Sequence, residues 1–347
     1  MKAIVHIGMP KAGSTTIQTF LQKNISNLQK QSFRYFRNLP KSSSQIEFPA
    51  AARGMLGEVI PQTNNMADMF SLRSPEDHKS FLEKFEREFS SKVESWNEDT
   101  YLISSEHIVP WTRKWPHVQA MDDFLKRYFS EVEYLIYVRR QEELILSSYS
   151  ERIKRGETLS FDEHFESRKK YNFMKMIRQW SDGLGRDRLT VRLLERDFLV
   201  NGDLLDDYCQ VTGIDRAPLS TPGRVNESLS AEATECLRRI NRFLSTYEKD
   251  GSRNEFRDRF QNQLMRKSQA QPNQKMTSVQ LAEVRELNAK SNELVRRHWF
   301  PERAELFPDT PERYVDEAQN YQSASSFSLA RKNLSWPFLL KPYGANK

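Results

Sequence analysis

The stretch KAIVHIGMPKAGSTT, residues 2–16, decides the fold of this chain. Residues 3–7 are mostly apolar or β-branched, which predicts a buried strand. Two glycines and a proline in residues 8–13 then indicate a tight loop. The hydroxyl residues Ser14–Thr16 stand where the next helix must begin. That helix has an apolar face at helical spacing, formed by Ile17, Phe20, Leu21 and Ile25.

A strand, a glycine-bearing loop and a helix N-terminus together form a phosphate-binding arrangement. The loop's N–H groups and the positive end of the helix dipole are directed at the same small volume. Gly8, Gly13 and Ser14 have the spacing of the nucleoside-triphosphate loop G-x-x-x-x-G-K-[ST], but the lysine stands at position 11. A kinase or NTPase of this type would need a lysine directly after Gly13 and a strand ending in an aspartate for Mg²⁺.

Four further strands are predicted along the chain, at 32–36, 100–104, 131–138 and 189–194. Helices predicted at 74–93, 117–129 and 141–154 alternate with them. This alternation predicts right-handed βαβ units, and hence an α/β fold in three layers (α/β/α) around a central, mainly parallel sheet.

The C-terminal part of the chain is predicted to be helical from about residue 220, with helices at 230–248 and 278–300. Residues 250–275, which are charged and rich in Gln and Asn, predict a loop or a frayed helix. We expect one domain over residues 1–310. Residues 311–347 show no period and form a C-terminal arm whose apolar residues predict that it packs on the domain.

In a parallel sheet, ligands bind at the carboxyl ends of the strands. Three groups of polar residues follow predicted strands: the loop after Ile7, Glu106 and His107 after the strand at 100–104, and Arg139 with Arg140 after the strand at 131–138. Strand order alone therefore predicts that these groups lie along one edge of the sheet.

The composition limits the possible classes of protein. Charged residues make up 29% of the chain and no apolar run approaches 18 residues, which predicts a protein without a membrane span. The loop begins within ten residues of Met1, which leaves no room for a cleavable signal peptide. The cysteines Cys209 and Cys236 have no disulfide or metal-binding spacing, so we expect a cytoplasmic protein. A net charge of +6 suits an anionic donor or an acidic glycan and does not indicate nucleic acid.

The segment HIGMPKAGSTT, residues 6–16, resembles the 5′-phosphosulfate loop of sulfotransferases, P-K-[ST]-G-[ST]-[ST]. The resemblance implies a P-loop fold, 3′-phosphoadenosine 5′-phosphosulfate (PAPS) as the sulfuryl donor, and 3′-phosphoadenosine 5′-phosphate (PAP) as its product. Ala12 stands where a hydroxyl residue is common, a departure of little cost if its backbone N–H is the working group. The donor-binding residues that the resemblance implies in this loop are Lys11, Ala12, Gly13, Ser14, Thr15 and Thr16.

Within that loop, the resemblance implies different tasks for the lysine and the hydroxyls. Lys11 fits the oxygen that bridges sulfur and phosphorus. Ser14–Thr16 fit the oxygens of the 5′-phosphate and the sulfonate.

Residues 139–148, RRQEELILSS, resemble the family's 3′-phosphate motif R-x₇-S. The doubled residues allow two registers: Arg139 with Ser147, or Arg140 with Ser148. We prefer the first because Arg139 directly follows the apolar strand. A third segment, RVNESL from Arg224, resembles R-x-N-x-S-L of bacterial relatives. It predicts either a nucleotide-facing loop or a helix-capping loop.

Glu106 and His107 are the candidates for the base that deprotonates the acceptor. The segment Ser-Ser-Glu resembles bacterial family members at the same strand, which favours Glu106. We expect like-charged surroundings to raise its pKa toward neutrality. Since adjacent residues of an extended segment point to opposite faces, the other residue would orient the base or bind substrate.

The sequence therefore predicts a PAPS-dependent sulfotransferase that transfers a sulfuryl group to a hydroxyl by in-line displacement, without a metal. A carbohydrate or glycolipid is the expected acceptor. The alternatives are a P-loop nucleotide kinase or NTPase, and a non-catalytic PAP-binding scaffold. His6 is predicted to be a core histidine. Trp111 and Trp115 either stack on a sugar ring or anchor a loop.

Overall fold

The computed structural model describes residues 1–39, 42, 44–61, 67, 70–223, 229–248, 252–268, 271–310 and 314–316. The chain divides into two compact units. The first unit comprises Met1–Arg139, Asn172–Val225 and Arg297–Trp299. The second comprises Arg140–Tyr171, Asn226–Arg296 and Phe300–Lys347.

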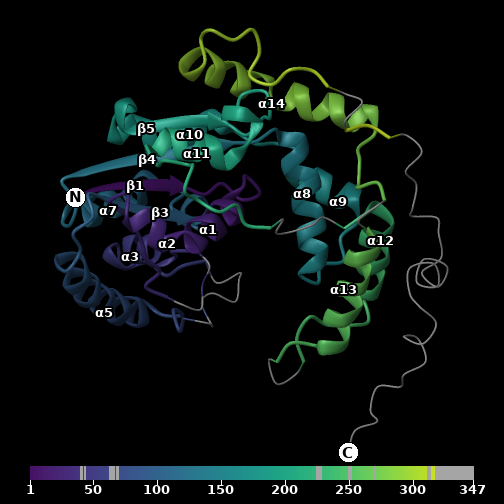
Figure 1. Cartoon of the computed structure of the whole chain (residues 1–347). Coiled ribbons are helices and arrows are strands. Elements are labelled where there is room, and N and C mark those ends of the chain that lie inside the picture. Colours follow the sequence, from purple (N-terminus) through teal and green to yellow (C-terminus); the bar gives the residue numbers. More distant parts are fainter. Residues whose placement is uncertain are drawn as a thin grey trace, which may run out of the picture. The chain divides into compact units, whose positions relative to one another are not determined.

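A sheet of five parallel strands forms the centre of the first unit (Figure 1). The strand order is β2-β3-β1-β4-β5, so β1 lies in the middle. Ile7 at the end of β1 pairs with Ser105 at the end of β3, which brings the ends of these two strands level. The strands are β1 (Lys2–Ile7), β2 (Phe33–Tyr35), β3 (Thr100–Ser105), β4 (Glu131–Val138) and β5 (Leu189–Leu193).

Helices cover both faces of this sheet. One group of helices in mutual contact is α1 (Ser14–Lys23), α2 (Ile25–Gln29) and α11 (Leu204–Thr212). The other is α3 (Glu47–Met55), α5 (Pro75–Glu94), α6 (Ile108–Trp111), α7 (Trp115–Lys126) and α10 (Phe173–Leu184). The chain leaves β1 toward one edge of the sheet and leaves β3 toward the other. Right-handed crossovers therefore place the two groups on opposite faces, and the predicted three-layer α/β fold is confirmed.

The connections that leave β1 and β3 run toward opposite edges of the sheet, and this change of direction locates the expected ligand-binding site. β1 lies between β3 and β4, and the helices that follow β1 and β3 lie on opposite faces. Such a switch point opens a crevice at the carboxyl ends of the strands. Short 3₁₀ turns at Arg186–Arg188 and Val200–Gly202 complete the connections around β5.

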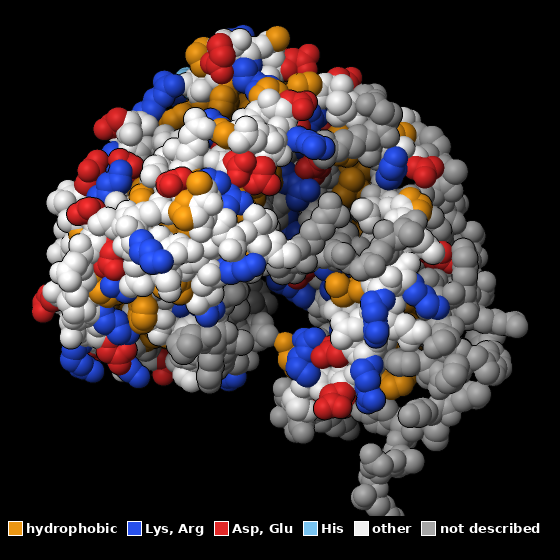
Figure 2. Space-filling view, in the orientation of Figure 1, with side chains coloured by type: hydrophobic (Ala, Val, Ile, Leu, Met, Phe, Trp, Pro, Cys, Tyr) orange, Lys and Arg blue, Asp and Glu red, His pale blue; other side chains and the backbone are white. Residues whose placement is uncertain are grey.

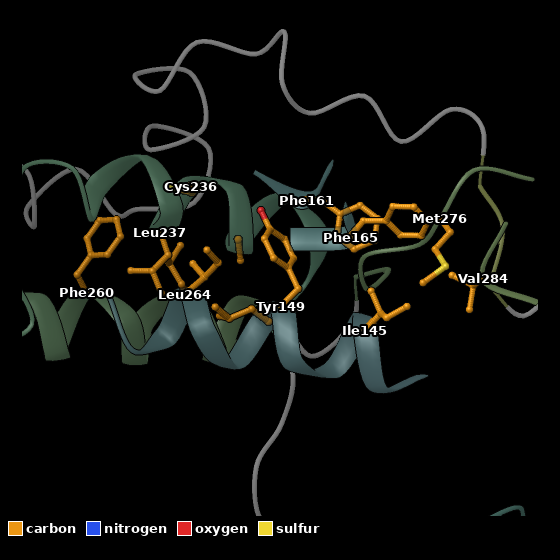
Figure 3. Close-up of a cluster of buried hydrophobic side chains, with 13 residues drawn as sticks. Ile145, Tyr149, Phe161, Phe165, Cys236, Leu237, Phe260, Leu264, Met276 and Val284 are labelled. Atoms are coloured by element: carbon orange, nitrogen blue, oxygen red, sulfur yellow. The ribbon is translucent and has the colours of Figure 1, made fainter. Parts of the chain in front are cut away.

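The second unit is helical, as predicted for the C-terminal part. It consists of α8 (Gln141–Lys154), α9 (Phe161–Arg168), α12 (Ala231–Ile240), α13 (Glu255–Ser268) and most of α14 (Ser278–Trp299). A shared apolar core joins these helices (Figure 3). Tyr149 of α8, Phe161 of α9, Leu237 of α12 and Phe260 of α13 all contribute to it.

Helix α13 lies in a segment whose many charged residues obscure its helical spacing of apolar residues. We expected a loop or a frayed helix over residues 250–275, yet Glu255–Ser268 is a helix of 14 residues. Its buried residues Phe260 and Leu264 are four apart and lie on one face. Packing of that face against the core stabilises a helix whose remaining positions are polar. Of the predicted arm, only 314–316 are described, so its packing stays a prediction.

The surface and the thiols are consistent with the composition. Basic and acidic side chains are interspersed on the face shown in Figure 2, as expected for a modest net charge of +6. Cys209 and Cys236 are buried free thiols, and burial raises the pKa of each to about 12. Among the described residues, no helix has the length and apolar character needed to cross a membrane.

Glu47, at the start of α3, is a fully buried carboxyl group. Its Oε1 accepts a hydrogen bond of 3.1 Å from Asn38 Nδ2, whereas Oε2 has no partner among the described residues. Burial raises its pKa to about 7, although the bonds from Asn38 and the charge of Lys92 oppose this shift. A protonated carboxyl group is therefore the form that the fold prefers.

This pKa predicts that Glu47 lowers the stability of the protein as pH rises. In the unfolded chain its pKa is about 4.3, so the stabilising contribution of Glu47 to the free energy of unfolding is fully present below that pH. It declines as pH rises and is lost at about pH 7, where the folded state also releases the proton. Urea unfolding of Glu47→Gln at pH 5 and pH 8 should show less of this decline than wild type, by roughly 2–3 kcal/mol. The exposed control Glu83→Gln should follow wild type; identical behaviour of all three proteins would contradict this role for Glu47.

Candidate active site

The loop after β1 lies directly against the end of β3. Gly8 N–H donates a 3.0 Å hydrogen bond to Ser105 C=O. A Cβ at Gly8 would lie 2.6 Å from that oxygen and 2.7 Å from Glu106 Cα, far inside van der Waals contact. Glycine is therefore required at this position, and its close approach brings Glu106 to the phosphate-loop segment.

Two residues with positive φ shape the loop. Lys11 has φ 65° and Gly13 has φ 86°. A Cβ at Gly13 would also collide with Leu204 at the start of α11, so only glycine fits there. Left-handed backbone is unfavourable for a residue with a Cβ, and residues held so are concentrated at functional sites. The strain at Lys11 thus marks the loop as a candidate binding element.

The first turn of α1 presents unused donors. The first hydrogen bond of the helix runs from Ile17 N–H to Gly13 C=O at 3.1 Å. The N–H groups of Ser14–Thr16 therefore have no partner within the helix and are directed out of its N-terminus. The hydroxyls of Thr15 and Thr16 are half-buried and make no hydrogen bond with a described residue. This end of α1 has the geometry of an anion site.

Ala12 and Ser14 take part in the loop's own structure. Ala12 N–H donates to Met9 C=O at 3.1 Å, and Ala12 is buried. Its backbone N–H, considered above as a working group, is thus occupied within the turn. Ser14 Oγ donates to the same carbonyl at 3.4 Å, a long contact that a better acceptor could replace.

Arg139, at the end of β4, reaches the same loop. Its Nη1 donates a 2.7 Å hydrogen bond to Lys11 C=O. Strands β1 and β4 are neighbours, so the sheet itself fixes this contact. A guanidinium group therefore lies beside the strained residue of the loop, which joins two of the three predicted groups.

The alternative register of the R-x₇-S motif involves residues already engaged in the second unit. Arg140 is 2% exposed, donates to Pro308 C=O at 2.6 Å, and its guanidinium lies 5.4 Å from the centre of the Phe307 ring. Ser148 Oγ contacts Ile145 C=O and His164 Nε2, each at 3.0 Å.

The structure does not test whether two predicted site residues, Ser147 and Arg224, lie beside the loop. Ser147 lies half-buried on α8 of the second unit, whereas Arg139 belongs to the first. Its hydroxyl makes no hydrogen bond with a described residue. Arg224 falls outside the described residues.

Glu106 directly follows β3, and its side chain remains 33% exposed. Oε2 accepts a 2.8 Å hydrogen bond from Gln18 Nε2, and Oε1 lies 3.9 Å from His107 Nδ1. Burial raises the pKa of this carboxyl group, but His107, the Gln18 amide, its own backbone N–H and the Ser44 hydroxyl outweigh burial and lower it below its ordinary value. The expectation of a pKa raised toward neutrality is therefore wrong in this structure. Donors surround the group where we expected like charges.

His107 is more buried than Glu106, and its Nδ1 lies nearer to the Ser44 hydroxyl than to the Glu106 carboxylate. Its side chain is 13% exposed, its Nδ1 lies 3.3 Å from Ser44 Oγ, and its ring is 4.8 Å from Trp111. Ser44 Oγ in turn lies 2.7 Å from Ser105 Oγ. Of the two adjacent residues, Glu106 is the more accessible.

Sequence reasoning missed Gln18 and Ser44. Gln18 lies one helical turn after Ser14, so the i, i+4 rule could have placed it above the loop. Ser44 comes from a connection some 60 residues before His107 and has no local signal.

Three residues that the sequence left as core or ligand candidates are structural. His6 is buried beside Ser104 Oγ at 2.9 Å, and burial lowers its pKa to about 4, so the predicted core histidine is confirmed. Trp111 is 1% exposed in an apolar cluster, and Trp115 packs against Gly183. Trp111 thus anchors a loop and has no face open to a sugar ring. Among the described residues, no cluster of His, Cys, Asp and Glu could hold a metal ion.

Comparisons with known proteins give limited similarity. No protein-family model matches the chain, and no curated protein matches it in sequence. The structure is similar to the crystal structure of a sulfotransferase from Alicyclobacillus acidocaldarius, with 16% identity and a TM-score of 0.39 over 65% of this chain and 85% of that one. It is also similar to the sulfotransferase domain from the curacin biosynthetic pathway, with 11% identity and a TM-score of 0.33 over 62% and 74% of the two chains. Similarity at these TM-scores supports no inference about activity, so the proposal of a function rests on the residues of this chain.

Proposed function

We propose that this chain is a PAPS-dependent sulfotransferase that transfers a sulfuryl group to a hydroxyl acceptor. One observation carries the proposal. The contact between Gly8 and Ser105 brings a lysine-bearing phosphate loop and the carboxylate of Glu106 to one edge of the sheet. A donor anion and a base are what transfer to a hydroxyl requires.

The donor would be held by the first turn of α1 and by the cations beside it. The N–H groups of residues 14–16 and the hydroxyls of Thr15 and Thr16 suit the 5′-phosphate and sulfonate oxygens. Arg139 suits the 3′-phosphate, together with Ser147 of α8, because a guanidinium group binds phosphate in a bidentate manner. Arg224 is proposed as a further nucleotide-facing residue. PAPS supplies the sulfuryl group, already activated by its anhydride bond to phosphate.

The chemical step assigns one task to each of two side chains. Glu106 accepts the proton of the acceptor hydroxyl while that oxygen forms a bond to sulfur. The bond from sulfur to the bridging oxygen breaks in line, and the charge that grows on this oxygen is met by the Lys11 ammonium. The lowered pKa of Glu106 keeps its carboxylate ionised at neutral pH, so the base is ready without a prior proton transfer.

The acceptor that we propose is a hydroxyl of a carbohydrate or glycolipid. A partly exposed carboxylate base and a net charge of +6 suit a neutral or acidic glycan. The free, buried thiols of Cys209 and Cys236 fit a reducing compartment, and we propose the cytoplasm.

Two rival functions fit the residues less well. A nucleotide kinase of the P-loop type needs a lysine directly after Gly13, and this chain has Ser14 at that position. A non-catalytic scaffold would have no use for a carboxylate kept ionised beside the loop.

Lys11 and Arg139 should differ in their kinetic effect. Lys11→Ala should lower turnover more than it weakens PAP binding, since its contact strengthens as charge develops on the leaving oxygen. Arg139→Ala should first weaken donor affinity, and Arg139→Lys should restore part of it. Exposed Lys30→Ala is the control. Steady-state kinetics and calorimetric titration with PAP measure both; the same profile for Lys11→Ala and Arg139→Ala would refute this division of roles.

Glu106 and His107 should separate in a transfer assay with labelled donor. Glu106→Gln keeps the shape but removes the base, so the rate should fall on the order of 10²–10⁴-fold while PAP binding persists. His107→Asn should be milder, because its ring is directed toward Ser44 and Trp111. An inactive His107→Asn beside an active Glu106→Gln would reverse the assignment, and two active variants would place the base elsewhere.

A further inference from the structure

Gln18 is a buried polar residue on the helix that carries the phosphate loop. It lies on α1, four residues after Ser14, so both side chains are on the same face. Its side chain is only 2% exposed in the interior of the first unit. An apolar residue would be the ordinary choice on the buried side of this helix, where Ile17 and Leu21 are its neighbours.

The amide of Gln18 is committed to the candidate base. Nε2 donates to Glu106 Oε2 at 2.8 Å and to Ser104 C=O at 3.4 Å. The amide oxygen, in contrast, accepts no hydrogen bond from a described residue. Reversing the amide would place this oxygen against the carboxylate, so the contacts favour the orientation with nitrogen toward Glu106.

This arrangement has a cost for stability. A buried carbonyl oxygen without a partner destabilises a fold, and native structures contain few of them. A residue that brings such an atom into the core therefore calls for a compensating role. Among the described residues, the one charged group to which Gln18 donates a hydrogen bond is the Glu106 carboxylate.

We propose that Gln18 is a positioning residue, which holds Glu106 ionised and fixes one of its oxygens so that the other faces the acceptor. Oε2 accepts the hydrogen bond from the Gln18 amide, and we assign the proton-accepting role to Oε1, which lies 3.9 Å from His107 Nδ1. Since Gln18 and Ser14 share one helix face, α1 ties the donor loop to the base. The role of the base rests on the proposed function, whereas the contact between Gln18 and Glu106 can be tested without it.

Several other groups act on the same carboxylate and must be distinguished from Gln18. His107 lies next to the carboxylate in the same segment, and the Ser44 hydroxyl donates a hydrogen bond to it. His6 on β1 and Tyr35 on β2 interact electrostatically with its charge. His6 is kept neutral at neutral pH by burial, which lowers its pKa to about 4. A change confined to Gln18 leaves all of these groups in place.

The decisive variant is Gln18→Met, which keeps the length of the side chain and removes its donor. The free energy of a hydrogen bond to a charged group is large enough that its loss should shift the titration midpoint of Glu106 by about one pH unit. We expect ¹³C NMR of labelled glutamate carboxyls to show this upward shift for the resonance that Glu106→Gln deletes. The acid limb of the pH–rate profile should move in parallel. Gln22→Met, an exposed glutamine on the same helix, is the matched control and should leave both unchanged.

An unchanged Glu106 midpoint in Gln18→Met would overturn the proposal. Should that variant fail to fold, the wild-type protein still decides. The Gln18 side-chain amide resonances should titrate with the midpoint of Glu106 and should cease to do so in Glu106→Gln; amide resonances that ignore pH would also overturn the proposal. If the wild-type protein transfers no sulfuryl group, the proposed function fails while the NMR result stands.

Discussion

The candidate site depends on one close approach, between Gly8 at the end of β1 and the backbone of Ser105 and Glu106 at the end of β3. Parallel pairing brings Ile7 level with Ser105, and the absence of a Cβ at Gly8 lets the chains remain together one residue further. The loop, the first turn of α1 and the candidate base are positioned by this contact. A larger residue would push the loop off the strand end and separate donor and base.

Electrostatics at the site favour an ionised base. Gln18, Ser44 and His107 offset the burial of Glu106, so its pKa lies below the ordinary value. A carboxylate of this kind is a weaker base than one tuned to neutrality, but it is fully deprotonated at neutral pH. Glu47 shows the opposite case in the same unit. One oxygen of Glu47 is weakly hydrogen-bonded and the other has no donor among the described residues, so burial dominates and raises its pKa to about 7.

The sheet and the loop could be predicted from sequence because their signals are local. Residues 2–16 contain a strand, two glycines and a helix start in one stretch, and the polar residues after β3 and β4 follow apolar runs directly. The contacts of Gln18 and Ser44 could not be predicted from local sequence, because they join side chains that come together only in the fold. The pKa of Glu106 was misjudged for the same reason. We expected a loop or a frayed helix where α13 lies because most of its residues are polar; the burial of Phe260 and Leu264, which stabilises the helix, depends on the fold.

We propose that the loop and Arg139 together recognise a nucleotide with anionic groups at both its 5′ and 3′ positions. Calorimetric titration of the purified chain with PAP and with AMP, without Mg²⁺, tests it most directly. A charge-assisted contact to the 3′-phosphate contributes roughly 1.5–3 kcal/mol, so PAP should bind at least tenfold more tightly than AMP. Equal affinities, or binding of ATP that requires Mg²⁺ and exceeds that of PAP, would contradict the account.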